Sequence, residues 1–300
     1  MPGGPGVVRE APAGGTDPER ASEPHIRKIL FPVDFRYTCY GTARYLEALS
    51  SHFDPRIMLL HAVEPERERL SPDLMSSRKL RLESFLASDL RYLKTERVCI
   101  EGKPSHVIVD VARNWTPDLI MLPSHGLGFF RRHFVGSVTA SALREISCPV
   151  WTSLHGENAP STGSIRFRKI LCSLDLGKHS PDVLRWASWF ASQYQAQLGV
   201  VHATEPVAAP GVWPQSNEFE LQLSRRVRER IDELASQSNA LASRVFVIPD
   251  SPALACSRAA REFGADLLVM GRHRVQSLPE DLIDHVYSIV AESPCPVVSV

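Results

Sequence analysis

The chain has 300 residues, of which 43% are hydrophobic and 23% charged, a composition typical of globular proteins and a length that fits two domains. Its 34 basic side chains balance 34 acidic ones, so no overall field favours nucleic acid or an anionic membrane, and we expect neither as a partner. No segment approaches the roughly 18 consecutive apolar residues of a membrane-spanning helix. Residues 1–24 are rich in Gly, Pro and Ala and lack the apolar run of a signal peptide, so they are predicted to form a disordered arm.

Strands and helices are predicted to alternate after this arm. Short apolar runs indicate buried strands, and apolar residues at helical spacing indicate amphipathic helices between them. We predict strands at 28–33, 57–62, 98–100, 118–122 and 149–152, separated by helices at 38–51, 72–93, 104–115 and 137–146. This alternation is typical of a parallel sheet that is covered by helices on both faces.

The second half of the chain repeats the first. The blocks Lys28–Asp34, His61-Ala62 and Cys148-Pro149-Val150 recur in the same order as Lys169–Asp175, His202-Ala203 and Cys295-Pro296-Val297. A period of about 140 residues is far above the 20–50 residues of solenoid repeats, so each copy is large enough to have its own core. We therefore predict an α/β protein with one domain at 25–155, a Gly/Ser/Pro-containing linker at 156–166 and a second domain at 167–300.

Candidate site residues follow from the predicted sheet. In an open parallel sheet, ligands bind outside the carboxyl ends of the strands. In the first domain these ends carry Asp34, Ala62 and the loop after the fourth strand. That loop ends in Gly136-Ser137 at a predicted helix start, where backbone N–H groups and a hydroxyl can hold an anion. It is not a Walker A loop, because no lysine follows the glycine, nor a GxGxxG fingerprint, because Arg131 occupies the third glycine position.

The six cysteines form no CxxC pair and no cluster with zinc spacing, so no metal site is predicted. Cys148 and Cys295 stand at matching positions before the last strand of each copy, which suits small buried side chains in a reducing compartment. We accordingly expect a cytoplasmic protein. Cys39 lies near a helix start, where a thiolate is favoured, but the sequence shows no resolving partner for it.

At these residues the chain resembles the universal stress protein family. Nucleotide-binding members carry G-x-x-G, nine residues and then G-(S/T) after strand four; here Gly126, nine intervening residues and Gly136-Ser137 fit the second part. The first strand ending in Asp34, the pair His61-Ala62 and the closing Cys-Pro-Val of both copies match as well. The resemblance covers about residues 26–153 and 168–300.

The resemblance implies two tandem flavodoxin-like (Rossmann-like) domains, each a five-stranded parallel sheet of order 3-2-1-4-5 with helices on both faces. It also implies a stress-response module that binds ATP or another adenine nucleotide in the first domain. Asp34 and the backbone at Ala62 would hold the adenosine, and the phosphates would be held by Gly126, Gly136, Ser137 and Val138. The duplication and the short linker predict that the domains pack through their last strands or adjoining helices into an intramolecular pseudo-dimer, with a homodimer as a further arrangement.

The chain departs from the family pattern in both copies. Pro123 replaces the first motif glycine, which removes one backbone N–H and fixes φ near −65°. In the second domain Arg274 replaces the second glycine, and Ile283-Asp284 replaces Gly-Ser. An aspartate at a phosphate-facing helix start repels an anion, so we predict a degenerate second site.

Three functions remain open. The first is a nucleotide-binding regulatory module that acts by partner binding, with the protein partner unspecified. The second is an interaction or dimerisation protein without nucleotide, which Pro123 favours. The third is a slow ATP-hydrolysing enzyme, for which the sequence offers no nucleophile–base pair, metal spacing or catalytic lysine loop, so no catalytic residue is predicted. Asp34 also has a simpler explanation, as the cap of a turn or helix.

Overall fold

The computed structural model describes residues 23–64, 72–123, 137–153, 159–204, 217–238, 240–272 and 280–300. Most of the predicted disordered arm, residues 1–22, lies outside these ranges, as do Gly126 and Gly136. In the part that the structure describes, no helix is long and apolar enough to cross a membrane.

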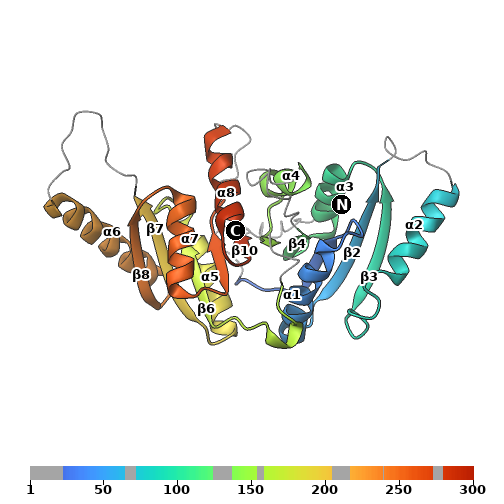
Figure 1. Ribbon diagram of the computed structural model, residues 1–300, viewed down its shortest axis with the longest axis horizontal. Coiled ribbons are helices and arrows are strands. Elements are labelled where there is room, and N and C mark those ends of the chain that lie inside the picture. Colours follow the sequence, from blue (N-terminus) through green and yellow to red (C-terminus); the bar gives the residue numbers. More distant parts are fainter. Residues whose placement is uncertain are drawn as a thin grey trace, which may run out of the picture.

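Strands and helices alternate in both halves (Figure 1). The first half contains β1 (Lys28–Pro32), α1 (Thr38–Phe53), β2 (Arg56–Val63), α2 (Pro72–Ser84), β3 (Thr95–Glu101), α3 (Pro104–Trp115), β4 (Leu119–Pro123), α4 (Ser137–Glu145) and β5 (Val150–Ser153). A short 3₁₀ turn at Thr162–Ser164 precedes the second half. That half contains β6 (Lys169–Ser173), α5 (Ser180–Gln193), β7 (Gln197–Thr204), α6 (Asn217–Gln237), β8 (Ala242–Pro249), α7 (Pro252–Phe263), β9 (Leu267–Met270), α8 (Glu280–Glu292) and β10 (Val297–Ser299).

The sheet confirms the predicted strand order in each half. All ten strands form one sheet of order β3-β2-β1-β4-β5-β10-β9-β6-β7-β8, so each half keeps the order 3-2-1-4-5. Neighbouring strands are parallel within each half, and β5 pairs with β10 in the antiparallel direction. The two five-stranded sheets are therefore joined through their last strands, one of the two packing modes that the sequence predicts.

The seam between β5 and β10 is locally two-fold symmetric. Trp151 lies opposite Val298 at its centre. On either side, the Thr152 hydroxyl donates to the Val297 carbonyl at 3.3 Å, and the Ser299 hydroxyl donates to the Val150 carbonyl at 3.4 Å. Equivalent side chains of the two copies thus satisfy equivalent backbone groups, as in the interface of a symmetric dimer.

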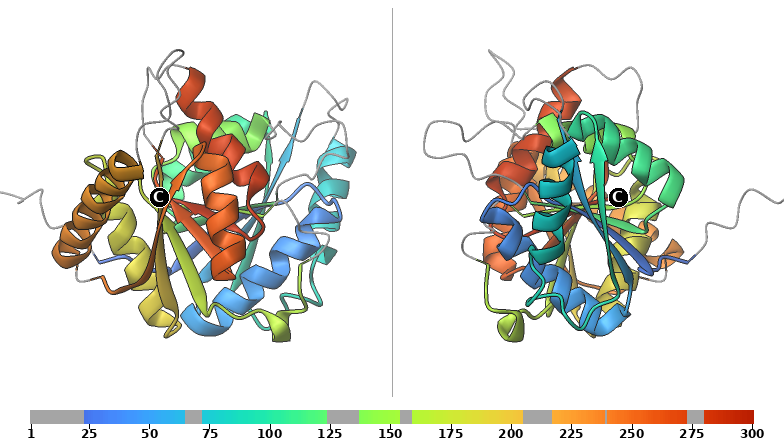
Figure 2. Two further views of the ribbon diagram at one scale, coloured as in Figure 1. Left: turned by 60° about the vertical axis from the view of Figure 1, so that its left-hand side comes forward. Right: turned by 90° about the vertical axis from the view of Figure 1, so that its right-hand side faces the viewer.

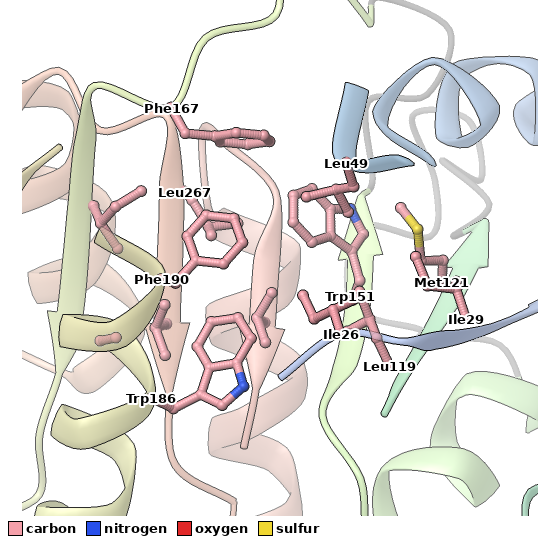
Figure 3. Close-up of a cluster of buried hydrophobic side chains, with 14 of the residues drawn as sticks. Ile26, Ile29, Leu49, Leu119, Met121, Trp151, Phe167, Trp186, Phe190 and Leu267 are labelled. Carbon is pink, nitrogen blue, oxygen red and sulfur yellow. The ribbon is translucent and has the colours of Figure 1, made fainter. Parts of the chain in front are cut away.

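Helices cover both faces of the sheet (Figure 2). On one face α1, α2, α5 and α6 bury their apolar sides in a single core that crosses the seam. Figure 3 shows part of this core, with Phe167, Trp186 and Phe190 of the second half near Trp151 of the first. On the other face α3 and α4 form one core and α7 and α8 another, and Val286 of α8 packs against both. The two halves are consequently held together on both sides of the sheet.

The helix predicted at 72–93 is shorter than expected, because α2 ends at Ser84. Leu86 adopts a left-handed backbone with φ 54°, which a helix cannot continue through. The Arg97 guanidinium, from β3, donates to the Leu82 and Phe85 carbonyls at 2.9 and 3.0 Å and so satisfies acceptors at the helix end. Leu90 beyond the turn is still buried, which explains why the apolar spacing extended past the true end.

Part of the predicted linker, residues 159–166, is described, and it is attached to α1. The Thr162 hydroxyl donates to the Glu47 carboxylate at 2.6 Å, and the Arg44 guanidinium donates to the Ala159 carbonyl. This portion of the linker therefore belongs to the packed interface between the halves.

An aspartate before the fourth strand of each half anchors the segment that enters the first strand. Asp118 accepts the backbone N–H groups of Arg27 and Lys28 at 2.8 and 2.9 Å. In the second half, Asp266 accepts those of Arg168 and Lys169 at 2.7 and 2.9 Å.

Asp118→Ala is expected to lower the free energy of unfolding by about 2 kcal/mol, because two backbone donors lose a charged acceptor. Urea denaturation measures the change. Asp266→Ala is the matched variant and should cost a similar amount. An effect below about 0.5 kcal/mol in both variants, the size expected of an ordinary surface substitution, would show that these contacts do not hold the strand entries.

Candidate functional site

The first candidate residue, Asp34, lies directly beyond the end of β1. Its carboxylate accepts the Arg36 N–H at 3.1 Å and the Cys39 thiol at 3.4 Å, and it pairs with the Arg36 guanidinium at 3.4 Å. Asp34 therefore caps the turn into α1, as the simpler explanation predicts. The side chain is nevertheless 39% exposed.

The residue after each strand-end aspartate has a left-handed backbone. The φ angle is 62° at Phe35 and 61° at Leu176, although neither residue is glycine. In the first half the turn is held by ring contacts: Phe35 lies 4.1 Å from His61 and 5.1 Å from Phe85, centroid to centroid. Such backbone strain persists only where the surroundings enforce it, and it concentrates at functional sites. Both halves therefore have an equivalent strained turn directly after the equivalent aspartate, Asp34 or Asp175.

Ala62 lies where β2 extends past its neighbour. The pairing of β1 with β2 ends at Pro32 and Leu60, whereas β2 continues to Val63 and pairs only with β3 beyond that point. The half-buried Ala62 is thus part of a strand end with no β1 residue paired beside it. This is the position at which a ligand can reach strand backbone at the carboxyl edge of the sheet.

The two strand-two histidines have structural contacts. His61 Nδ1 donates to the Val33 carbonyl at 2.9 Å, and His202 Nδ1 donates to the Leu174 carbonyl at 2.7 Å. Each ring ties the second strand to the turn that carries the aspartate. The histidines therefore help to fix the position of Asp34 and Asp175.

The phosphate end of the predicted first site is only partly described. Helix α4 begins at Ser137, as the sequence predicts, and the half-buried Val138 packs against the core beneath it. Pro123 is the last residue of β4 and pairs with Ser153. Gly126 and Gly136 lie outside the described residues. The structure thus places Asp34 and Ala62 at the carboxyl edge and Ser137 and Val138 at the start of α4.

The second half has a cavity of about 720 Å³ at its carboxyl edge. Asp175, Ser180 and Ala203 line it at positions that correspond to Asp34, Cys39 and Ala62. The Asp175 carboxylate accepts the Gly177 N–H and the Ser180 hydroxyl, both at 2.8 Å. Leu143 and Arg144 also line this cavity, although they belong to α4 of the first half.

The start of α8 differs from that of α4, where the sequence predicts that the phosphates bind. Counted back from the shared Cys-Pro-Val, Asp284 corresponds to Ser137, yet α8 already begins at Glu280, one turn earlier. In an α-helix only about the first four N–H groups are free, so the amide of residue 284 is used within the helix. The extra turn removes the donors that a phosphate would need at this position.

The Cys39 thiol is unsuited to a redox role. The residue is fully buried, and this burial raises the pKa of the thiol to about 12, so it remains protonated at neutral pH. The helix start therefore does not produce a thiolate here, because desolvation outweighs it. Ser180 occupies the same position in the second half, which indicates that the site needs a small donor to the aspartate.

A further cavity of about 590 Å³ lies beside the linker at the opposite edge of the second half. Three charged residues, Arg166, Arg168 and Asp266, are among those that line it. Asp266 is the strand-entry anchor and accepts the backbone N–H groups of Arg168 and Lys169. Among the described ranges, no three or more His, Cys, Asp or Glu side chains are grouped so as to hold a metal ion.

These features define a class: two flavodoxin-like α/β domains fused in tandem, with the candidate site residues at the carboxyl edges of their sheets. Residues 25–153 and 166–300 both match the Universal stress protein family. The chain belongs to the universal stress protein family.

Individual relatives agree with this assignment. A universal stress protein of Thermus aquaticus is 32% identical over 133 residues, which cover 41% of this chain and 96% of that protein. A universal stress protein crystal structure from Archaeoglobus fulgidus has a TM-score of 0.68 at 18% identity and covers 92% of this chain and 96% of its own. A functionally unknown protein of Pseudomonas aeruginosa has a TM-score of 0.64 at 14% identity, with 92% of each chain covered. At these identities the two structures show the shared fold.

Two aspects of the site were missed by the sequence interpretation. The recurrence of Asp175 and Ala203 signalled a second carboxyl-edge position, but the cavity there was not foreseen. Nor was the contribution of Leu143 and Arg144, which no local pattern indicates because it depends on the antiparallel seam.

Proposed function

We propose that this universal stress protein binds an adenine nucleotide at the carboxyl edge of its first domain and acts through nucleotide-dependent binding of a protein partner. The observation that carries the proposal is the partly exposed Asp34 carboxylate, held in a strained turn between the end of β1 and the start of α1. A carboxylate in this place is suited to accept hydrogen bonds from ribose hydroxyls.

The other predicted residues have complementary roles in this proposal. The backbone of β2 at Ala62 would contact the base, because the strand extends beyond its β1 partner there. Gly126 and Gly136, with Ser137 and Val138 at the start of α4, would hold the phosphates through backbone N–H groups and the serine hydroxyl. The six cysteines are free thiols, which suits a protein working in the reducing cytoplasm.

The output that we infer is binding, not turnover. Efficient phosphoryl transfer needs metal-held phosphates, a positioned nucleophile and a cationic clamp, and the sequence supplies no lysine in the loop after β4. Any ATP hydrolysis is therefore expected to be far slower than the roughly 1–100 s⁻¹ of kinases.

One observation favours the alternative, an interaction protein without nucleotide. Pro123 ends β4 where the family motif has its first glycine, so one backbone donor is missing from the loop. Mass spectrometry of small molecules released from the denatured protein separates the two functions. Released adenine nucleotide supports the proposal, whereas a blank together with no calorimetric binding of ATP supports the alternative.

Asp34→Ala is expected to weaken ATP binding at least tenfold in titration calorimetry, because the ribose loses a charged hydrogen-bond acceptor. Asp175→Ala is the matched control, since it removes the corresponding carboxylate of the second domain and should leave ATP affinity unchanged. Gly136→Asp should abolish binding by placing a negative charge at the helix start. ATP binding that survives both first-domain changes but is lost in Asp175→Ala would refute the assignment.

A further inference from the structure

The cavity of the second domain has walls from both domains. Helices α4 and α8 lie next to each other near the middle of the molecule (Figure 1), and the Tyr287 hydroxyl of α8 donates to the Ala140 carbonyl of α4 at 3.3 Å. Val286 of α8 packs against the core that contains Leu143. Helix α4 therefore closes the side of the cavity that faces the seam, through Leu143 and Arg144.

Two arginines place positive charge on the side of the cavity that faces the seam. Arg144 is exposed in the last turn of α4, and no carboxylate among the described residues forms an ion pair with it. Arg272 directly follows β9 and is 7% exposed, and its guanidinium donates across the seam to the Cys148 carbonyl. The sheet order β10-β9-β6-β7 places Arg272 on the seam side of Asp175, which follows β6. Arg144 lines the same cavity from α4 of the first domain.

The other walls of the cavity suit a small organic molecule. Leu174, Val183, Met270 and Ile289 supply apolar walls, and Asp175 with Ser180 supplies polar groups next to them. The other lining carboxylate, Asp250, accepts the Ser251 N–H at 2.8 Å and lies 3.8 Å from the Arg258 guanidinium. A volume of about 720 Å³ is within the range of ligand sites of small molecules.

We propose that this cavity is a composite site for a nucleoside monophosphate, or a similar molecule with one anionic group, and that Arg144 of the first domain binds the anion. A guanidinium presents several donors to a phosphate and can replace the backbone cradle that the extra turn of α8 removes. A triphosphate would need that cradle and is disfavoured. The inference rests on the proposed function in its choice of an adenine nucleotide, but it concerns a different site.

Methionine methyl NMR tests the proposal in the intact protein. The chain has five methionines, and Met270 lines the cavity, so its methyl resonance, assigned with Met270→Leu, reports occupancy of this site alone. AMP should shift the Met270 signal in a saturable way, and adenosine and ATP should each bind there at least about tenfold more weakly. An unmoved Met270 signal at millimolar AMP, or equal affinity for AMP and ATP, would overturn the proposal.

Arg144→Ala should weaken AMP binding at Met270 about tenfold and leave adenosine binding unchanged, because only the anion contact is lost. Arg261→Ala is the matched control: this arginine is likewise exposed in the last turn of a helix, α7, but does not line the cavity. Equal AMP affinity in both variants would refute the role of Arg144. Asp34→Ala should retain the Met270 response, so failure of the first-domain site is distinguishable from failure of this one.

Discussion

Trp151→Ala is expected to lower the free energy of unfolding by about 3–5 kcal/mol, the range for removing a buried aromatic side chain. Trp151 is fully buried at the centre of the seam, opposite Val298. Its ring lies 5.5 Å from Tyr45 of α1 and 5.9 Å from Phe167, which leads into the second half. The vacated volume would therefore lie between the two domains, in the core shown in Figure 3.

Urea denaturation monitored by circular dichroism measures this loss. Trp151→Phe should recover part of it, because a smaller ring still fills most of the space. Trp115→Ala is a matched control, since this tryptophan is only half-buried at the end of α3 and packs within the first domain. If Trp151→Ala cost no more than Trp115→Ala, the seam would not be the stabilising contact that its burial indicates.

The sequence allowed each half to be predicted because the signals are local. Apolar runs such as Ile29–Phe31 are fully buried in the structure, and their alternation with helical spacing identifies a parallel α/β sheet. The seam is different. Only Val297, Val298 and Ser299 of β10 pair with β5, and three residues carry too little pattern to reveal antiparallel pairing with a strand about 147 residues away. The duplication suggested a pseudo-dimer without deciding between strand and helix contacts.

The candidate site residues likewise include some that the local sequence predicts and some that depend on how the domains pack. Asp34 and Ala62 were predictable because the carboxyl end of a parallel strand is defined by its own sequence. The extra turn of α8 also had a local signal, since Glu280-Asp281 is an acidic pair of the kind that favours a helix start. The cavity walls from α4 had no such signal. They depend on how the domains meet, so Arg144 could be assigned to the second cavity only from the structure.

Raising the pH from about 9 to 10 is expected to lower the free energy of unfolding by about 5 kcal/mol through four thiols that burial keeps protonated in the folded state. Burial raises the pKa of Cys39 and of Cys295 to about 12 and that of Cys256 to about 11, and it also raises the pKa of Cys172. An unfolded thiol titrates near pH 8.5. Above that pH the unfolded state releases thiol protons that the folded state keeps. The contribution of these thiols to the free energy of unfolding is therefore fully present below about pH 8.5 and is lost as the pH rises towards the folded pKa.

Urea denaturation at about pH 7, 9 and 10 in the presence of a reducing agent measures this loss. Each thiol contributes up to about 1.4 kcal/mol per pH unit, so Cys39→Ser should remove roughly a quarter of the decrease. Serine is the appropriate replacement because Ser180 makes the same contact to Asp175 in the second half that Cys39 makes to Asp34 in the first. Lysines and tyrosines titrate equally in the wild type and the variant. Subtracting the two slopes of unfolding free energy against pH therefore removes their contribution. Equal slopes would show that the Cys39 thiol is accessible to solvent, and that the turn carrying Asp34 opens more readily than its packing indicates.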